Sequence, residues 1–251
     1  MDGVAVKLER LKREAKREWK RKWRQKLRQA APATSAEWRA LAGEALSAVL
    51  KIVLIIALPF GVLVRGSVFI YQHGQTPVWV AVLTAAFLTG GVVTAYAVWL
   101  ARKFTNRGGR GGRALVMPLA KWVALPLVVF YCSYSLLYLA SVNAKSEPVR
   151  AYYRAVHPLL RLALSTLILV DRDMLITDSG RQPEDYGRMG LPTNNRTRHY
   201  KQADGWIHAV DLRTTGRGAI KNRGVQLYFW MMGFDTRRHI GTADHLHVEL
   251  N

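Results

Sequence analysis

The stretch VWVAVLTAAFLTGGVVTAYAVWLA, residues 78–101, decides the fold class because it contains no charged side chain. About 20 apolar residues are enough for a helix to cross the hydrocarbon core of a bilayer. Gly90 and Gly91 in its middle would let a neighbouring helix approach closely. We therefore predict a membrane-spanning helix here, because its length and hydropathy disfavour a buried helix of a soluble protein.

Two further apolar runs flank this stretch and have comparable lengths. The first covers about residues 45–64, with Lys51 near its start, and the second covers about 122–142. Pro126 should kink the latter, because proline removes one helical hydrogen bond and crowds the preceding turn. Together the three runs predict a membrane region over residues 42–143 with three transmembrane helices.

The distribution of positive charge predicts the orientation of these spans. Lys and Arg number 37 against 17 Asp and Glu, for a net charge of +20. Basic residues are dense before the first span and in the loop 102–113, whereas the loop 65–76 contains Arg65 alone. Positively charged loops stay in the cytoplasm. The chain is thus predicted to be a multi-pass plasma-membrane protein, with a cytoplasmic amino terminus and an extracytoplasmic carboxy-terminal domain.

Residues 1–41 form a basic segment before the first span. Residues 5–30 predict a helix with a narrow apolar stripe, and the stripe consists of Leu8, Leu11, Trp19, Trp23 and Leu27. We interpret it as an amphipathic helix on anionic lipid headgroups; a solvated tail and a nucleic-acid-binding arm are the alternatives. Export of the carboxy-terminal domain disfavours nucleic acid as that domain's partner. The only cysteine, Cys132, lies in an apolar run and excludes an internal disulfide.

Residues 144–251 are long enough for a small exported domain. A helix is expected from Glu147 to Val170, interrupted at Pro158, and its apolar part is too short for a fourth span. Short strands are expected after it, at residues 174–177, 207–212, 225–231 and 245–250. A helix followed by short strands predicts an α+β domain with a small antiparallel sheet.

Histidines are concentrated in this domain, since five of the seven follow residue 190. Neutral imidazoles with a carboxylate are the ligands that a catalytic zinc ion prefers. His245 and His247 in the segment HLHVEL would project to one face of a strand, because residues two apart share a face. The composition therefore makes a metal site a candidate feature of this domain.

Three segments in order resemble the motifs of the M15 family of zinc peptidases. They are SGRQ (179–182), His199 with GWIHAVDL (205–212), and DHLHVEL (244–250). That family includes D-Ala-D-Ala carboxypeptidases and dipeptidases and phage L-Ala-D-Glu endolysins. The resemblance covers about residues 175–250 and implies a zinc-peptidase fold, a Zn²⁺ cofactor and peptidoglycan stem peptides as substrate.

The resemblance also implies roles for individual residues. Asp211 and His247 match two metal ligands, and Asp244 matches the general base that activates the attacking water. Arg181 matches the arginine that anchors the substrate, and Ser179 and Gly180 match the turn that presents it. Asp244 departs from the commoner glutamate and is shorter by one methylene group.

The first histidine ligand has two candidates, His199 and His208. In the commonest family spacing this position lies seven residues before the aspartate and is Asp204 here. If residues 207–212 form a strand, His208 and Asp211 point to opposite faces, because their separation is odd. His199 precedes the strand and also matches a longer-spaced variant of the motif. We therefore predict His199, with His208 as the alternative.

The predicted function is that of a membrane-anchored zinc metallopeptidase that hydrolyses peptide bonds in the cell wall. The alternative is a non-catalytic zinc- or peptide-binding module of an envelope assembly. The substitution of aspartate for the commoner glutamate at position 244 and the large membrane region favour this alternative.

Overall fold

The computed structural model describes residues 14, 16–24, 35–105, 114, 116–188, 190, 192, 197–241 and 244–251. The chain divides into two compact units, Met1–Ile55 and Ile56–Asn251. In the first unit, residues 16–24 are helical and Trp19 packs against Trp23 at a ring-centroid distance of 5.8 Å. The remainder of the predicted 5–30 helix, apart from Glu14, lies outside the described residues.

Among the described residues, three helices are long and apolar enough to cross a membrane, as the sequence predicts. α2 covers Ser35–Gly74 and α3 covers Val78–Thr105. The third consists of α5 (Val116–Leu119), a π-helical turn (Ala120–Ala124) and α6 (Leu125–Leu137). The candidate spans within them are Trp38–Gly74, Val78–Lys103 and Val116–Leu137. The widened π-helical turn directly precedes Pro126, where the ring would crowd the carbonyl of Trp122 in a regular helix.

A buried helix, α8, connects these spans to the sheet. The chain passes from α6 through a 3-10 turn (Ser141–Asn143), α7 (Glu147–Tyr152) and a second 3-10 turn (Tyr153–Ala155) into α8 (Pro158–Val170). Pro158 begins α8 because the first helical position needs no backbone donor. The hydroxyl oxygen of Tyr131 in α6 lies 2.6 Å from Thr166 Oγ1 in α8. The hydroxyl of Tyr228, from the helix Ala219–Met232, donates to the carbonyl of Ala163 in α8 at 2.9 Å. α8 is therefore a core helix shared by the membrane side and the sheet side of this unit.

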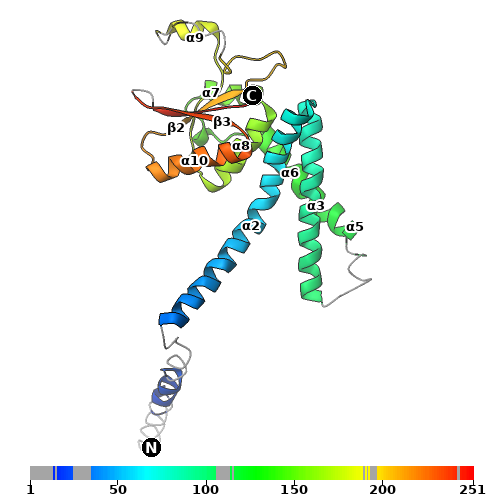
Figure 1. The fold of residues 1–251 in the computed structure, drawn as a ribbon, viewed down its shortest axis with the longest axis vertical. Helices are drawn as coiled ribbons and strands as arrows, with labels where there is room; N and C mark the ends of the chain where they lie inside the picture. The colour runs from blue at the N-terminus through cyan, green and yellow to red at the C-terminus, as the bar shows by residue number, and fades with distance from the viewer. Residues whose placement is uncertain are drawn as a thin grey trace, which may run out of the picture. The chain divides into compact units, whose positions relative to one another are not determined.

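The sheet has four antiparallel strands in the order β1-β2-β4-β3. Their bounds are Ile176–Asp178 for β1, Ala209–Arg213 for β2, Asp235–His239 for β3 and His245–Glu249 for β4. A short helix α9 (Pro183–Arg188) follows β1, and α10 (Ala219–Met232) follows β2. This arrangement confirms the predicted α+β class with a small antiparallel sheet. In Figure 1, α8 and α10 lie on the same side of the sheet.

Two sequence predictions within the sheet are wrong. Residues 225–231 were expected to form a strand, but they belong to α10, in which Val225 and Phe229 are buried four residues apart. Helix signals flank this segment, with Gly218 as N-cap and Gly233 as a left-handed C-cap. β3 was not expected, because DTRRH is polar and lacks alternation; as an edge strand it pairs with β4 alone.

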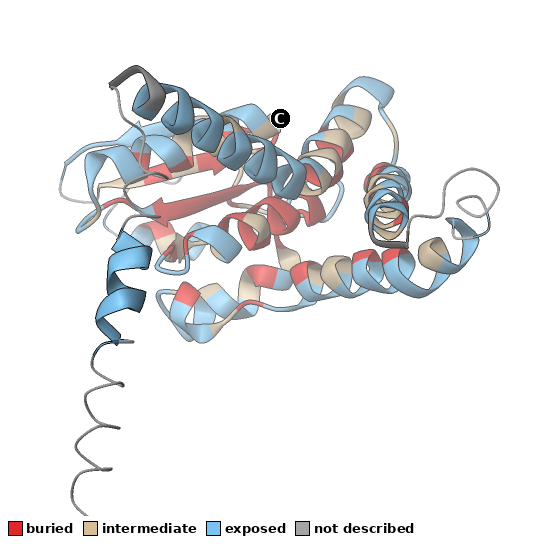
Figure 2. Ribbon diagram, turned by 90° about the horizontal axis from the view of Figure 1, so that it is seen from below, coloured by how far each residue is buried: buried red, intermediate tan, exposed pale blue. Residues whose placement is uncertain are grey.

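The two faces of the central strands differ in chemistry. Val210, Leu212, Leu246 and Val248 are buried in one hydrophobic cluster with residues of α8 and α10. Figure 2 shows that the buried positions concentrate in the sheet and in the helix packed against it. The alternating odd-numbered residues of β2 and β4 occupy the opposite face, which carries the histidines.

Candidate metal centre

The register of β2 with β4 places Asp211 directly opposite His247. His245 and Glu249 share this strand face, because each is two residues from His247. Apolar residues of the alternate positions fill the core and so fix which face the histidines occupy. The strand pairing alone therefore brings a carboxylate and an imidazole together.

His199 joins this pair from the loop that precedes β2. Two backbone hydrogen bonds hold that loop, from Arg181 N to His199 O at 3.1 Å and from His208 N to Arg198 O at 3.0 Å. The His199 side chain is only 2% exposed. The structure thus brings His199, Asp211 and His247 together in a group that could hold a metal ion, and we call it the metal triad.

The geometry of the metal triad suits a single ion. His199 Nε2 lies 3.3 Å from His247 Nδ1 and 3.3 Å from Asp211 Oδ1, and His247 Nδ1 lies 2.9 Å from Asp211 Oδ1. A tetrahedral ion with bonds of about 2.0–2.2 Å separates its ligand atoms by about 3.3–3.6 Å. Two edges of the triangle match this spacing and the third is a few tenths of an ångström shorter.

Electrostatics keep the carboxylate of the metal triad ionised. Burial alone would raise the pKa of Asp211, but hydrogen bonds from His199 and His247 outweigh it and hold that pKa well below its usual range. Asp211 Oδ2 also accepts a hydrogen bond from Arg181 Nη2 at 2.9 Å. One carboxylate oxygen is therefore oriented by an arginine, and the other is directed at the two imidazoles.

The outer nitrogen of His247 has a partner of its own. His247 Nε2 lies 3.2 Å from Glu249 Oε2. Such a carboxylate commonly fixes the tautomer and orientation of a metal-binding histidine. The sequence prediction did not include Glu249, although its spacing of two from His247 in HLHVE would have placed it on the same face. For His199, the buried Nδ1 has no hydrogen-bond partner among the described residues.

The turn that follows β1 positions Arg181. Gly180 N donates to Asp178 Oδ1 at 3.2 Å, and Ser179 Oγ donates to the carbonyl of Val149 at 2.8 Å. A Cβ atom on Gly180 would lie 2.8 Å from Ile207 Cδ1 and 3.0 Å from Tyr152 Cδ1, so a larger residue there would have to displace these side chains. Arg181 donates to Asp178, Asp211 and Tyr186, and these contacts join the predicted turn to the metal triad.

Asp244 immediately precedes β4, and its carboxylate has other partners in this structure. Thr214 Oγ1 donates to Asp244 Oδ1 at 2.6 Å, and Arg238 Nη2 donates to Oδ2 at 3.0 Å. These hydrogen bonds lower the pKa of Asp244, with Arg238 contributing most. Asp244 is therefore an ionised carboxylate next to the histidine-rich strand, but it is not a member of the metal triad.

His208 belongs to a second group, formed with His157 and Asp204. His208 Nε2 lies 2.8 Å from Asp204 Oδ2, and His157 Nε2 lies 3.9 Å from the same oxygen. His157 Nδ1 accepts a hydrogen bond from Leu159 N, so the neutral ring carries its proton on Nε2 and has no lone pair for a metal there. Burial, followed by the neighbouring His208, lowers the pKa of His157 to about 3. This second group therefore suits a metal ion less well than the metal triad does.

Comparisons with known proteins do not assign a family to this chain. No family model, curated protein or solved structure matches it.

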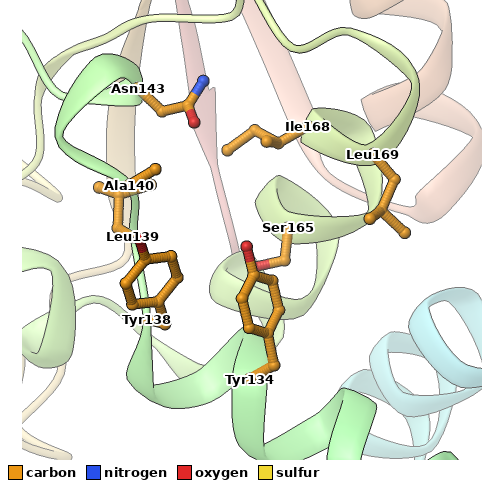
Figure 3. Close-up of a pocket in the computed structure, with 8 residues that line it drawn as sticks. All are labelled: Tyr134, Tyr138, Leu139, Ala140, Asn143, Ser165, Ile168 and Leu169. Carbon is orange, nitrogen blue, oxygen red and sulfur yellow. The ribbon is translucent and has the colours of Figure 1, made fainter.

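A small pocket lies away from the metal triad, between the end of α6 and α8 (Figure 3). It is lined by Tyr134, Tyr138, Leu139, Ala140, Asn143, Ser165, Ile168 and Leu169. Its volume of about 20 Å³ is enough for a water molecule and too small for a peptide.

Proposed function

We propose that this protein is a membrane-anchored zinc metallopeptidase that cleaves peptide bonds in peptidoglycan stem peptides. The observation that carries the proposal is the metal triad, whose three ligand atoms lie 2.9–3.3 Å apart. Two imidazoles and one carboxylate leave a fourth position open, as catalytic zinc sites do. A zinc ion held there would supply Lewis-acid chemistry by polarising the scissile carbonyl and making water a nucleophile near neutral pH.

Three further residues have roles in this proposal. Asp244 accepts the proton of the attacking water and returns it to the leaving amine. To do so its carboxylate must exchange the hydrogen bond that it accepts from Arg238 for one that it accepts from the water. Arg181 holds Asp211 in place, and its N–H groups beyond those given to Asp178, Asp211 and Tyr186 would donate to a substrate carboxylate or oxyanion. Ser179 and Gly180 fix the turn that positions this arginine.

The choice of substrate rests on the resemblance to the M15 family and on the charge pattern of the spans. The basic loop 102–113 and the basic amino-terminal segment favour the cytoplasm, so an odd number of spans exports the domain. Peptidoglycan stem peptides are short, carry free carboxylates and lie outside the plasma membrane. An arginine beside an open metal position matches that chemistry.

Metal analysis of the full-length protein tests the site. We expect about one zinc ion per chain in the wild type, and almost none after His199→Ala or Asp211→Ala. His208→Ala is the matched control, because His208 is bonded to Asp204 outside the metal triad. Zinc that is retained in His199→Ala and lost in His208→Ala would overturn this assignment of the ligands.

A non-catalytic zinc- or peptide-binding module is the second candidate. The engagement of Asp244 by Thr214 and Arg238 favours it, because a general base needs an accessible oxygen. Hydrolysis of purified stem peptides, followed by mass spectrometry, separates the two functions. An enzyme loses hydrolysis in Asp244→Asn while keeping its zinc. A wild type that binds zinc and cleaves no stem peptide would support the binding module instead.

A further inference from the structure

α10 carries apolar side chains on the face that points away from the core as well as on the face that packs. Val225 and Phe229 are buried against the sheet and α8. On the opposite side, Ile220, Leu227 and Met231 are 89%, 53% and 55% exposed. Their spacings of seven and four place them on one helical stripe, the outer face of α10.

The composition of the outer face is unusual for a helix in water. Trp230, 67% exposed, adjoins the stripe, and Arg223 is a charged residue within it. A surface helix of a soluble domain normally carries charged and polar residues opposite its packed face. Contiguous apolar side chains on such a surface mark contact with a membrane or another protein.

The position of α10 indicates which of these covers the outer face. A Cβ atom on Gly233, which caps α10, would overlap the Arg65 guanidinium and lie 2.9 Å from Val68 Cγ1. Gln72 Nε2 also donates to the carbonyl of Gly233 at 3.4 Å. Arg65, Val68 and Gln72 all belong to the candidate span Trp38–Gly74. The carboxy-terminal end of α10 is therefore packed directly on a membrane helix.

The charged residues of α2 indicate at what level in the membrane α10 contacts this helix. Between Lys51 and Arg65 the helix has no charged residue, and Arg65 is its last charged residue before α2 ends at Gly74. Charged residues at that point of a span lie at the boundary between lipid and water. A helix joined to α2 at Arg65 is thus level with the headgroups. Tryptophan and arginine are residues that such a helix uses there.

We propose that α10 is an interfacial helix that inserts Ile220, Leu227, Trp230 and Met231 into the headgroup region of the membrane crossed by α2. Arg223 then lies among lipid phosphates. Because α10 and the metal triad occupy opposite faces of the sheet, lipid contact through α10 turns the triad towards the aqueous phase. This orientation is independent of whether the triad is catalytic.

Fluorescent labelling of single cysteines in the full-length protein tests the proposal. Cys132 is the only cysteine, so Cys132→Ser provides the background. Leu227→Cys and Met231→Cys carry the environment-sensitive label NBD in vesicles of phosphatidylcholine and phosphatidylglycerol, with and without doxyl-labelled lipid. Lys201→Cys, exposed in the loop that carries His199, is the matched control. Gly224→Cys adds a third probe on the same face, with open space around its Cβ, in case one variant does not purify.

We expect blue-shifted emission at positions 227 and 231, and quenching by doxyl lipid about twofold or more stronger than at position 201. Equal quenching at the three positions would overturn the proposal. Blue-shifted emission without quenching by lipid would also overturn it, because a second copy of the chain or another protein would then cover the outer face.

Discussion

At the residue scale, the two ring nitrogens of His247 contact different carboxylates. Nδ1 lies 2.9 Å from Asp211 Oδ1 within the metal triad, and Nε2 lies 3.2 Å from Glu249 Oε2. An acceptor at Nε2 holds the proton there and leaves the Nδ1 lone pair for a metal ion. Glu249 is therefore a positioning residue for the proposed zinc site and does not touch the ion.

This division of tasks predicts the effect of changing Glu249. Loss of a carboxylate that orients a ligand weakens metal affinity by about 10–100-fold, so we expect this loss for Glu249→Ala. Glu249→Gln keeps a carbonyl acceptor and should recover most of the affinity. Competition with a chromophoric chelator measures the zinc dissociation constant directly, without reference to activity.

Glu184→Ala serves as the control for Glu249→Ala, because it removes an exposed acidic side chain from α9. Its zinc affinity should equal that of the wild type. If Glu249→Ala also binds zinc as tightly as the wild type, the contact with His247 has no orienting role.

At the element scale, the helix-breaking geometry at the end of α10 predicts a stability difference between two glycines. Gly233 has φ of +94°, and a Cβ there would also meet Arg65 and Val68. Gly233→Ala should therefore destabilise the protein by more than about 1 kcal/mol. Gly224 lies inside α10 with nothing within 4 Å of an added Cβ, so Gly224→Ala should be neutral or stabilising by up to about 1 kcal/mol. Thermal unfolding of the full-length protein in detergent compares the two. Equal melting temperatures would contradict the packing of Gly233 on α2.

The elements that could be predicted from sequence share a strong local signal. Residues 78–101 are long and apolar enough to span a bilayer. In β2 and β4 apolar residues alternate with polar ones, and this alternation places Asp211 and His247 on the polar face. β3 could not be predicted, because DTRRH takes its strand conformation from pairing with β4. Residues 225–231 were misassigned, because a short apolar run fits a strand and a helix equally well until its caps are considered. Context decides where local patterns are ambiguous.

The candidate site could also be predicted only in part from the sequence. The strand parity that separates His208 from Asp211 could be derived from the sequence, and the structure places His208 with Asp204 and His157. The partners of Arg181 and Asp244 could not be derived. They depend on where the turn after β1 and the edge strand β3 lie relative to the central strands. Side-chain partners from distant segments need the tertiary arrangement.

At the scale of the whole molecule, the carboxy-terminal part of α2 and the sheet belong to one compact unit, Ile56–Asn251. The buried helix α8 contacts α6 on one side and α10 on the other, through Thr166 and Ala163. The candidate metal centre thus shares a hydrophobic core with the parts of the candidate spans that lie in Ile56–Asn251. If these spans cross a membrane, their orientation also decides which compartment the metal triad faces.

The last prediction concerns that orientation. Alkaline phosphatase is active only after export, so a fusion after Asn251 should be active in a bacterial host, and a fusion of the chain truncated after Arg113 should be inactive. The reason is that the basic loop 102–113 stays cytoplasmic while the odd number of spans exports the carboxy terminus. Green fluorescent protein at the same two positions gives the converse control. A phosphatase that is active after Arg113 and inactive after Asn251 would place the metal triad in the cytoplasm. Peptidoglycan would then be excluded as its substrate, while the zinc affinity of the triad would be unchanged, because the ligands are held by strand pairing and not by the compartment.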